Sequence, residues 1–329
     1  MRPRVFVTQP VAASAIERLR AVADVRLNPD PLHIPTRDEL IAAVRESDIL
    51  FCLLHDTIDD SVIEANPKLR AIASMKITPS GIAVAAATAR SIPVTVIPPI
   101  VTEATADLHM GLLIAVARRI LEGDRAVRNA VFPGGQSSYF EGASVFGKTI
   151  GLIGGGGRIG RAVARRAHGF SMQALYWSPR RKDPADEAEW DIDFVPLDEL
   201  LARADFVSIH APLNEGTRHL VGAREIALMK PSAFLVNTAR GPIVDEAALV
   251  KALQERRIAG AGLDVFEHEP AVHEALLTMP NVVLTPHLGS AVGELREFMA
   301  HVVVDNILAV LDERKPPNCW NAEIYGSSS

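Results

Sequence analysis

The stretch from Thr149 to Gly160 reads TIGLIGGGGRIG, and it decides the fold of the residues around it. Its β-branched start, Thr149–Ile153, predicts a strand, and the residues after Gly160 predict a helix. Between strand and helix, G-x-G-x-x-G begins at Gly155 and ends at Gly160. Such glycines allow a tight turn, a close approach of pyrophosphate, and packing of the helix on the strand. The alternative is a glycine-rich surface loop, which would not need this strand–turn–helix context. We therefore predict a dinucleotide-binding turn on a helix N-terminus, with contacts from Gly155, Gly157, Arg158, Ile159 and Gly160.

Outward from this turn, short apolar runs alternate with amphipathic stretches along the whole chain. This alternation predicts an α/β fold with parallel sheets and helices on both faces. The expected strands are Arg4–Thr8, Asp48–Leu54, Leu69–Ala73, Val94–Ile97, Thr149–Ile153, Ala174–Trp177, Phe206–His210, Phe234–Asn237, Gly260–Leu263 and Val282–Leu284. The expected helices include Ala12–Ala23, one long helix from about Thr105 to Arg128, Arg161–Ala167 and Gly293–Asp312.

Composition restricts the classes of protein that fit. The 329 residues suggest about two domains. With 34 basic and 40 acidic residues the net charge is −6, which argues against a nucleic-acid or polybasic membrane partner. Two separated cysteines, Cys52 and Cys319, give neither a disulfide framework nor a zinc site, and no apolar run reaches the roughly 18 residues of a membrane span. We expect a cytoplasmic protein without a metal, ending in a flexible tail at Gly326–Ser329.

The end of the strand after the glycine turn distinguishes two dinucleotides. An NAD site usually has Asp or Glu about 20 residues beyond the turn, where it binds the ribose hydroxyls. Here residues 178–182 read SPRRK, and no acid occurs before Asp183. Ser178 can hydrogen-bond a 2′-phosphate, and Arg180 or Arg181 can pair with it. The sequence thus favours NADP(H) over NAD(H), with a solvated basic loop as the alternative.

Three later segments, each just past an expected strand, carry Arg240, Glu269 and His287. Ligands of an open α/β sheet bind outside the carboxyl ends of its strands, so these side chains could converge. Arg240 can bind a carboxylate bidentately and polarise a neighbouring carbonyl. His287 can exchange a proton with the carbonyl oxygen while hydride is transferred. Glu269 can orient the imidazole and raise its pKa. Each residue alone also fits a structural role, but their order favours a dehydrogenase site.

With these motifs, the chain resembles the D-isomer-specific 2-hydroxyacid dehydrogenase family over nearly its whole length. The SPRRK turn is most similar to NADPH-dependent glyoxylate and hydroxypyruvate reductases of that family. The resemblance implies a homodimer that reduces a small 2-keto acid to the D-2-hydroxy acid. It implies a Rossmann cofactor domain, residues 101–289, inserted in a discontinuous flavodoxin-like substrate domain, residues 1–100 and 290–329. It also implies cofactor contacts from Thr105, Thr238 and Asp264.

The sequence departs from the family's usual pattern at two places. The glycine turn is one residue longer, so which glycine approaches the pyrophosphate stays open. After the strand at Leu69–Ala73, the usual Gly-x-Asp-Asn-type loop is replaced by residues 74–81, SMKITPSG, in which Lys76 could bind an anionic substrate as a point charge. Phosphite dehydrogenases of the family carry a similar lysine, so oxidation of phosphite or another small anion is an alternative. A dinucleotide-sensing, corepressor-like binding protein is a second alternative.

Overall fold

The computed structural model describes residues 2–326, so most of the predicted tail lies outside the described residues. The chain divides into two compact units. Met1–Ile100 and Ala291–Ser329 form the first, and Val101–Ser290 form the second. The first unit is therefore built from the two ends of the chain.

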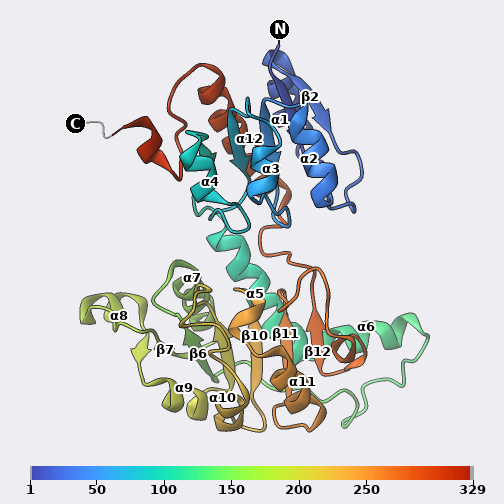
Figure 1. The fold of residues 1–329 in the computed structure, drawn as a ribbon. Helices are drawn as coiled ribbons and strands as arrows, with labels where there is room; N and C mark the ends of the chain where they lie inside the picture. The colour runs from blue at the N-terminus through green and yellow to red at the C-terminus, as the bar shows by residue number, and fades with distance from the viewer. Residues whose placement is uncertain (1, 327–329) are drawn as a thin grey trace. The chain divides into compact units, whose positions relative to one another are not determined.

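The described residues of the first unit form a five-stranded parallel sheet in the order β2-β1-β3-β4-β5, which is the flavodoxin-like order. Figure 1 shows helices on either side of this sheet. The strands β3 and β4 are buried at every residue, because helices cover both faces of the sheet. The strands are β1 (Arg4–Val7), β2 (Asp24–Leu27), β3 (Ile49–Cys52), β4 (Ala71–Ser74) and β5 (Val94–Thr95), and the helices are α1 (Ala13–Val22), α2 (Arg37–Arg45), α3 (Asp60–Glu64), α4 (Val84–Ala89) and α12 (Gly293–Leu311).

Residues 101–290, all of them described, form a seven-stranded parallel sheet in the order β12-β11-β10-β9-β6-β7-β8. From the glycine turn onward this is the Rossmann order, extended by one strand. The strands are β6 (Thr149–Ile153), β7 (Gln173–Trp177), β8 (Asp193–Phe194), β9 (Phe206–Ile209), β10 (Phe234–Asn237), β11 (Gly260–Leu263) and β12 (Val282–Leu284). The helices are α5 (Thr102–Ala117), α6 (Ile120–Arg128), α7 (Arg158–His168), α8 (Pro184–Trp190), α9 (Leu197–Arg203), α10 (Ala223–Leu228) and α11 (Glu246–Gln254).

The fold class predicted from the sequence is confirmed, but one predicted helix is wrong. The continuous helix expected from Thr105 to Arg128 is two helices, α5 and α6, separated at Arg119, whose φ is 53°. The break has a tertiary cause: the backbone N–H of Ala143, far along the chain, donates to the carbonyl oxygen of Ala117 at 2.8 Å. That bond satisfies a carbonyl at the end of α5, where helices otherwise leave it unpaired.

Two edge strands, β2 and β8, were not expected from the sequence. The residues of β2 alternate between exposed and half-buried, and β8 has only two residues. Short, partly polar edge strands lack the continuous apolar run that marks a buried parallel strand. The helix after the glycine turn also begins at Arg158, three residues before the predicted Arg161. Local sequence is therefore a weak guide to short edge strands and to the first residue of a helix.

Candidate active site

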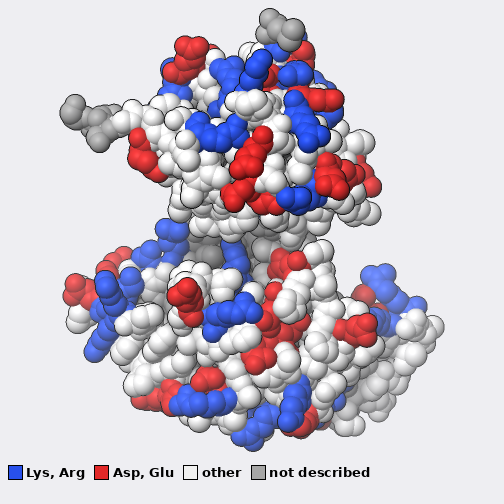
Figure 2. Space-filling model, in the orientation of Figure 1, with Lys and Arg blue, Asp and Glu red and all other residues white. Residues whose placement is uncertain are grey.

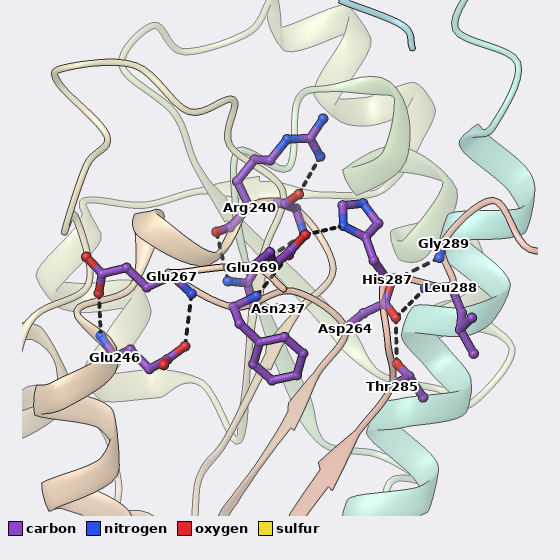
Figure 3. Close-up of polar contacts among 12 residues, drawn as sticks. Asn237, Arg240, Glu246, Asp264, Glu267, Glu269, Thr285, His287, Leu288 and Gly289 are labelled. Atoms are coloured by element: carbon purple, nitrogen blue, oxygen red, sulfur yellow. Dashed lines mark hydrogen bonds and ion pairs between the residues drawn. The ribbon is translucent and has the colours of Figure 1, made fainter. Parts of the chain in front are cut away.

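The carboxyl ends of β10, β11 and β12 position the three residues that the sequence singled out. These strands are neighbours in the sheet, so the segments that follow them lie at one edge. Figure 3 shows the side chains of Arg240, Glu269 and His287 gathered beyond the strand ends. The second unit alone therefore brings these three side chains to one edge of its sheet.

Glu269 holds the imidazole of His287 through a bond of 2.8 Å between Oε2 and Nδ1. The other carboxylate oxygen, Oε1, accepts the backbone N–H of Phe266 at 3.0 Å. The side chains of His287 and Glu269 are 19% and 20% exposed. Because Nδ1 is bonded to the carboxylate, Nε2 is the ring nitrogen that would exchange a proton with a substrate. The backbone of His287 also has φ at 56°, a conformation that costs free energy for this residue type and occurs often at active sites.

Asp264 fixes the loop on which His287 lies. Its buried carboxylate accepts the Thr285 hydroxyl at 2.6 Å and the Leu288 N–H at 2.7 Å on Oδ1. Oδ2 accepts the Gly289 N–H at 2.9 Å, and burial raises the pKa of this carboxyl. Thr105 extends the clamp, because its hydroxyl donates to the carbonyl oxygen of Gly289 at 3.1 Å. Both residues were expected to contact the cofactor, and the structure shows them holding the histidine loop.

Asn237 shapes the turn that presents Arg240, and the sequence analysis did not single it out. Its side-chain amide donates to the Arg240 carbonyl oxygen and accepts the Ala239 N–H, both at 3.0 Å. The guanidinium of Arg240 is exposed and donates to the Ala239 carbonyl oxygen at 2.6 Å. The sequence could have pointed to Asn237, because an Asn at the end of an apolar strand is expected to be buried, and a buried amide must find hydrogen-bond partners.

Glu246 and Glu267 tie the loop before Glu269 to the start of α11. The N–H of Glu267 donates to the Glu246 carboxylate at 3.0 Å, and the N–H of Glu246 donates back to the Glu267 carboxylate at 3.3 Å. Glu267 is also 2.6 Å from Nε2 of His219. These reciprocal bonds, drawn in Figure 3, stiffen the segment that carries Glu269. They join segments distant in sequence, so no local pattern predicts them.

The glycine turn leaves little space for side chains. A Cβ on Gly154 would be 2.6 Å from the backbone N of Ala211, and the residue has φ at 86°. A Cβ on Gly155 would be 2.7 Å from the Cβ atoms of Leu152 and Tyr176. Gly157 is the N-cap of α7, and a Cβ on Gly160 would be 2.6 Å from Cα of Gly155.

Gly156 is the exception in this turn. A Cβ there would meet only the aliphatic part of Lys182, whose Cε would be 2.6 Å away. Arg158 and Ile159 begin α7, so their backbone N–H groups belong to the helix N-terminus that favours a pyrophosphate.

The basic turn after β7 is organised by a buried tyrosine. The Tyr176 hydroxyl donates to Glu187 at 2.6 Å and accepts the Lys182 N–H at 2.8 Å. Arg181 donates twice to the same Glu187 carboxylate, at 2.9 and 2.7 Å. The Ser178 hydroxyl donates to the carbonyl oxygen of Arg180. Arg181 thus has a carboxylate partner, whereas no acid among the described residues pairs with Arg180 or Lys182.

Lys76 lies in the first unit and is 5% exposed. Its ammonium donates to the carbonyl oxygens of Asp56 at 2.9 Å and Ser80 at 2.8 Å. Burial lowers its pKa. Two of the three N–H groups of this ammonium therefore hold loops of the same unit together.

The second unit fits a nicotinamide dinucleotide. The glycine turn offers backbone close to a helix N-terminus, and cationic side chains follow the neighbouring strand. At the end of β9, the buried Nε2 atom of His210 has no hydrogen-bond partner among the described residues. A polar group of a bound ligand at this edge would satisfy such an atom.

On the face in view, Figure 2 shows basic and acidic side chains interspersed over both units. Within the described chain, no three His, Cys, Asp or Glu residues are grouped to hold a metal ion. No described helix is long and apolar enough to cross a membrane.

Comparison with known proteins agrees with this geometry. Residues 110–289 match the family described as "D-isomer specific 2-hydroxyacid dehydrogenase, NAD binding domain". A glyoxylate reductase of Thermococcus litoralis is 44% identical over 332 residues, which cover 100% of this chain and 99% of the relative. A crystal structure of a glyoxylate reductase from Paecilomyes thermophila is 30% identical with a TM-score of 0.81, covering 97% of this chain and 98% of that one. The NADPH-dependent glyoxylate/hydroxypyruvate reductase of Sinorhizobium meliloti, crystallised with citrate, is 31% identical with a TM-score of 0.79 over 98% of each chain.

The fold, the glycine turn and these matches define an NAD(P)-dependent oxidoreductase with two parallel-sheet units. The chain belongs to the D-isomer-specific 2-hydroxyacid dehydrogenase family. Its glyoxylate reductase relatives support the reduction of a small 2-keto acid. The family predicted from the motifs is thus confirmed.

Proposed function

We propose that this enzyme reduces glyoxylate, hydroxypyruvate or a similar small 2-keto acid with NADPH. The observation that carries the proposal is the 2.8 Å pair of Glu269 and His287, at the same sheet edge as Arg240. An acid–base pair beside a guanidinium suits a substrate that carries a carboxylate next to a carbonyl. The cofactor would bind the second unit, where the glycine turn lies.

Bound NADPH would supply the hydride that the carbonyl carbon accepts. Arg240 binds the substrate carboxylate and draws electron density toward the carbonyl oxygen. His287 gives its Nε2 proton to that oxygen, which becomes the hydroxyl of the D-2-hydroxy acid, and it accepts the proton back in the reverse reaction. Glu269 holds the ring in place and stabilises the imidazolium before the proton is transferred.

NADPH is favoured because Arg180 remains available for a 2′-phosphate, whereas Arg181 is bound to Glu187. Arg180→Gln should raise the KM for NADPH about tenfold or more and leave that for NADH nearly unchanged, since it removes a charge-assisted bond. Arg181→Gln is the matched control and should mainly lower stability. Steady-state kinetics with both cofactors give the ratio of the KM for NADPH to the KM for NADH in each variant. Equal losses with NADPH and NADH from Arg180→Gln would show that the 2′-phosphate is not bound there.

A crossed assay of nicotinamide absorbance tests the substrate class. Glyoxylate, hydroxypyruvate and pyruvate would be offered with NADPH or NADH, and phosphite and D-glycerate with the oxidised cofactors. Consumption of NADPH with glyoxylate or hydroxypyruvate is the expected result. Turnover of phosphite alone would instead favour an anion-oxidising enzyme that uses Lys76. Cofactor binding without any turnover would favour the dinucleotide-sensing alternative.

The partner that we propose is a second copy of the chain. Helix α6 has no buried residue, yet Ile120, Leu121 and Val127 expose apolar side chains on it. Light scattering should give about twice the mass of the 35.5 kDa chain. A Leu121→Asp and Val127→Asp variant should be monomeric, and Leu32→Asp, at an apolar residue that is 90% exposed in the first unit, should remain dimeric. A monomeric wild-type protein would contradict the proposal.

A further inference from the structure

A buried histidine joins the hydroxyl groups of two neighbouring strands in the second unit. His109, on α5, is 0% exposed. Its Nδ1 is 2.9 Å from the hydroxyl oxygen of Thr238, just after β10. Its Nε2 bonds to the hydroxyl of Ser208 on β9. A histidine among apolar side chains of a helix normally needs such partners, but here the two partners also determine where its proton lies.

The protons of this chain of groups can be assigned from donor and acceptor rules. Within the described residues, His109 is the one hydrogen-bond partner of the Ser208 hydroxyl. Because Ser208 is buried, a hydroxyl proton without an acceptor would be costly, so we assign this hydroxyl as the donor to Nε2. A neutral imidazole that accepts on Nε2 carries its proton on Nδ1. Nδ1–H donates to the Thr238 oxygen, which leaves the Thr238 hydroxyl proton to be donated elsewhere. Each group thus donates to the next: Ser208 donates to His109, and His109 donates to Thr238.

The environment keeps this imidazole neutral. Burial, reinforced by the neighbouring His210, holds the pKa of His109 well below its ordinary value of 6.5. The two rings have centroids 4.6 Å apart. Burial lowers the pKa of His210 to about 3. The direction of the hydrogen bonds is therefore unaffected by pH over the range in which the enzyme would work.

We infer that His109 is a positioning residue that makes the Thr238 hydroxyl a permanent donor to the bound dinucleotide. Thr238 lies at the carboxyl end of β10, two residues before Arg240, where the reacting half of the cofactor would lie. Its acceptor would be an oxygen of that half, a ribose hydroxyl or the carboxamide. This inference rests on the proposed function, because it requires a cofactor at this edge.

A titration of the intact enzyme with NADPH, followed by protein fluorescence, tests the inference without any substrate. Thr238→Val and His109→Leu should each weaken binding about fivefold, which is the typical value of one neutral hydrogen bond. The double variant should be no weaker than Thr238→Val, because His109 acts on the cofactor only through the Thr238 hydroxyl. His109→Gln, whose amide can bridge two hydroxyls, should restore binding to within about twofold of wild type. His168→Leu, which removes a histidine bond at the far end of α7, should leave binding unchanged.

Unchanged binding by folded His109→Leu, or additive losses in the double variant, would overturn the inference. Nitrogen NMR of the wild-type histidines gives an independent measurement if that variant does not fold. The Nδ1–H form of His109 is expected, and an Nε2–H form would overturn the assignment. Failure of the wild-type enzyme to reduce any keto acid, with normal NADPH binding, would contradict the proposed function and not this inference.

Discussion

The contacts of single residues refine the roles that their positions suggested. Arg180 and Arg181 are equivalent in the sequence, but only Arg181 has a carboxylate partner, Glu187. Asp264 lies near the site, yet its carboxylate accepts three hydrogen bonds from the loop around His287. A charged side chain that is hydrogen-bonded to neighbouring protein groups holds those groups in place.

The residue-scale prediction concerns His287. His287→Ala should lower kcat by about 10²- to 10⁴-fold, the usual contribution of a general acid, because it removes the imidazole that Glu269 holds at 2.8 Å. Binding of NADPH should stay within about twofold of wild type, since the imidazole acts on the substrate oxygen. Stopped-flow reduction of glyoxylate and a cofactor titration measure the two effects, with His33→Ala as an exposed control. Unchanged turnover would remove His287 from the mechanism.

At the scale of elements, the glycine turn and α7 depend on close contact between Gly155 and Gly160. The sequence motif predicted this packing, and the structure adds which glycines are required. Gly154, Gly155 and Gly160 face backbone or buried side chains, whereas Gly156 faces the flexible Lys182. In the longer turn, Gly155 and Gly160 approach each other closely, so the start of α7 packs against the turn.

A matched pair of variants tests this distinction. Gly160→Ala should lower the free energy of unfolding by about 1–3 kcal/mol and weaken NADPH binding, because the added methyl forces α7 away from the turn. Gly156→Ala should cost less than about 1 kcal/mol, since the Lys182 side chain can move. Denaturant unfolding and cofactor titration of both variants give the comparison. Similar damage from both would mean that Gly156 is also confined by backbone.

At the scale of the whole molecule, buried histidines link folding to pH. An unfolded histidine binds a proton near pH 6.5, but burial keeps His109 and His210 unprotonated well below that value. Below pH 6.5 the unfolded chain therefore binds more protons than the folded one, and stability falls as the pH falls. Each buried histidine contributes a slope of about 1.4 kcal/mol per pH unit.

Carboxylates also make the free energy of unfolding depend on pH. The contribution of His109 is therefore measured as the difference between variants in the slope of that free energy against pH. Urea unfolding between pH 7 and pH 4.5 should show a shallower loss of stability in His109→Gln than in wild type, by up to about 1.4 kcal/mol per pH unit. His33→Gln, at an exposed position, should retain the wild-type slope. Identical slopes in all three proteins would show that His109 is protonated in the folded state.

The sequence by itself determined the class of fold and predicted the candidate catalytic residues. Buried parallel strands are continuous apolar runs, and a glycine turn between strand and helix is a local pattern, so both can be recognised without a structure. Arg240, Glu269 and His287 could be predicted because each follows such a strand, and carboxyl ends of parallel strands meet at one edge.

Tertiary structure alone decided the breaks between elements and the partners of polar groups. The long helix ends at Ala117 because the N–H of Ala143 pairs with its carbonyl oxygen. The guanidinium of Arg181 donates to the Glu187 carboxylate. His109 bridges Ser208 and Thr238, which are 99 and 129 residues away along the chain. Apolar periodicity is a local property of the sequence. A hydrogen bond between distant residues instead depends on which atoms the fold brings within about 3 Å of each other.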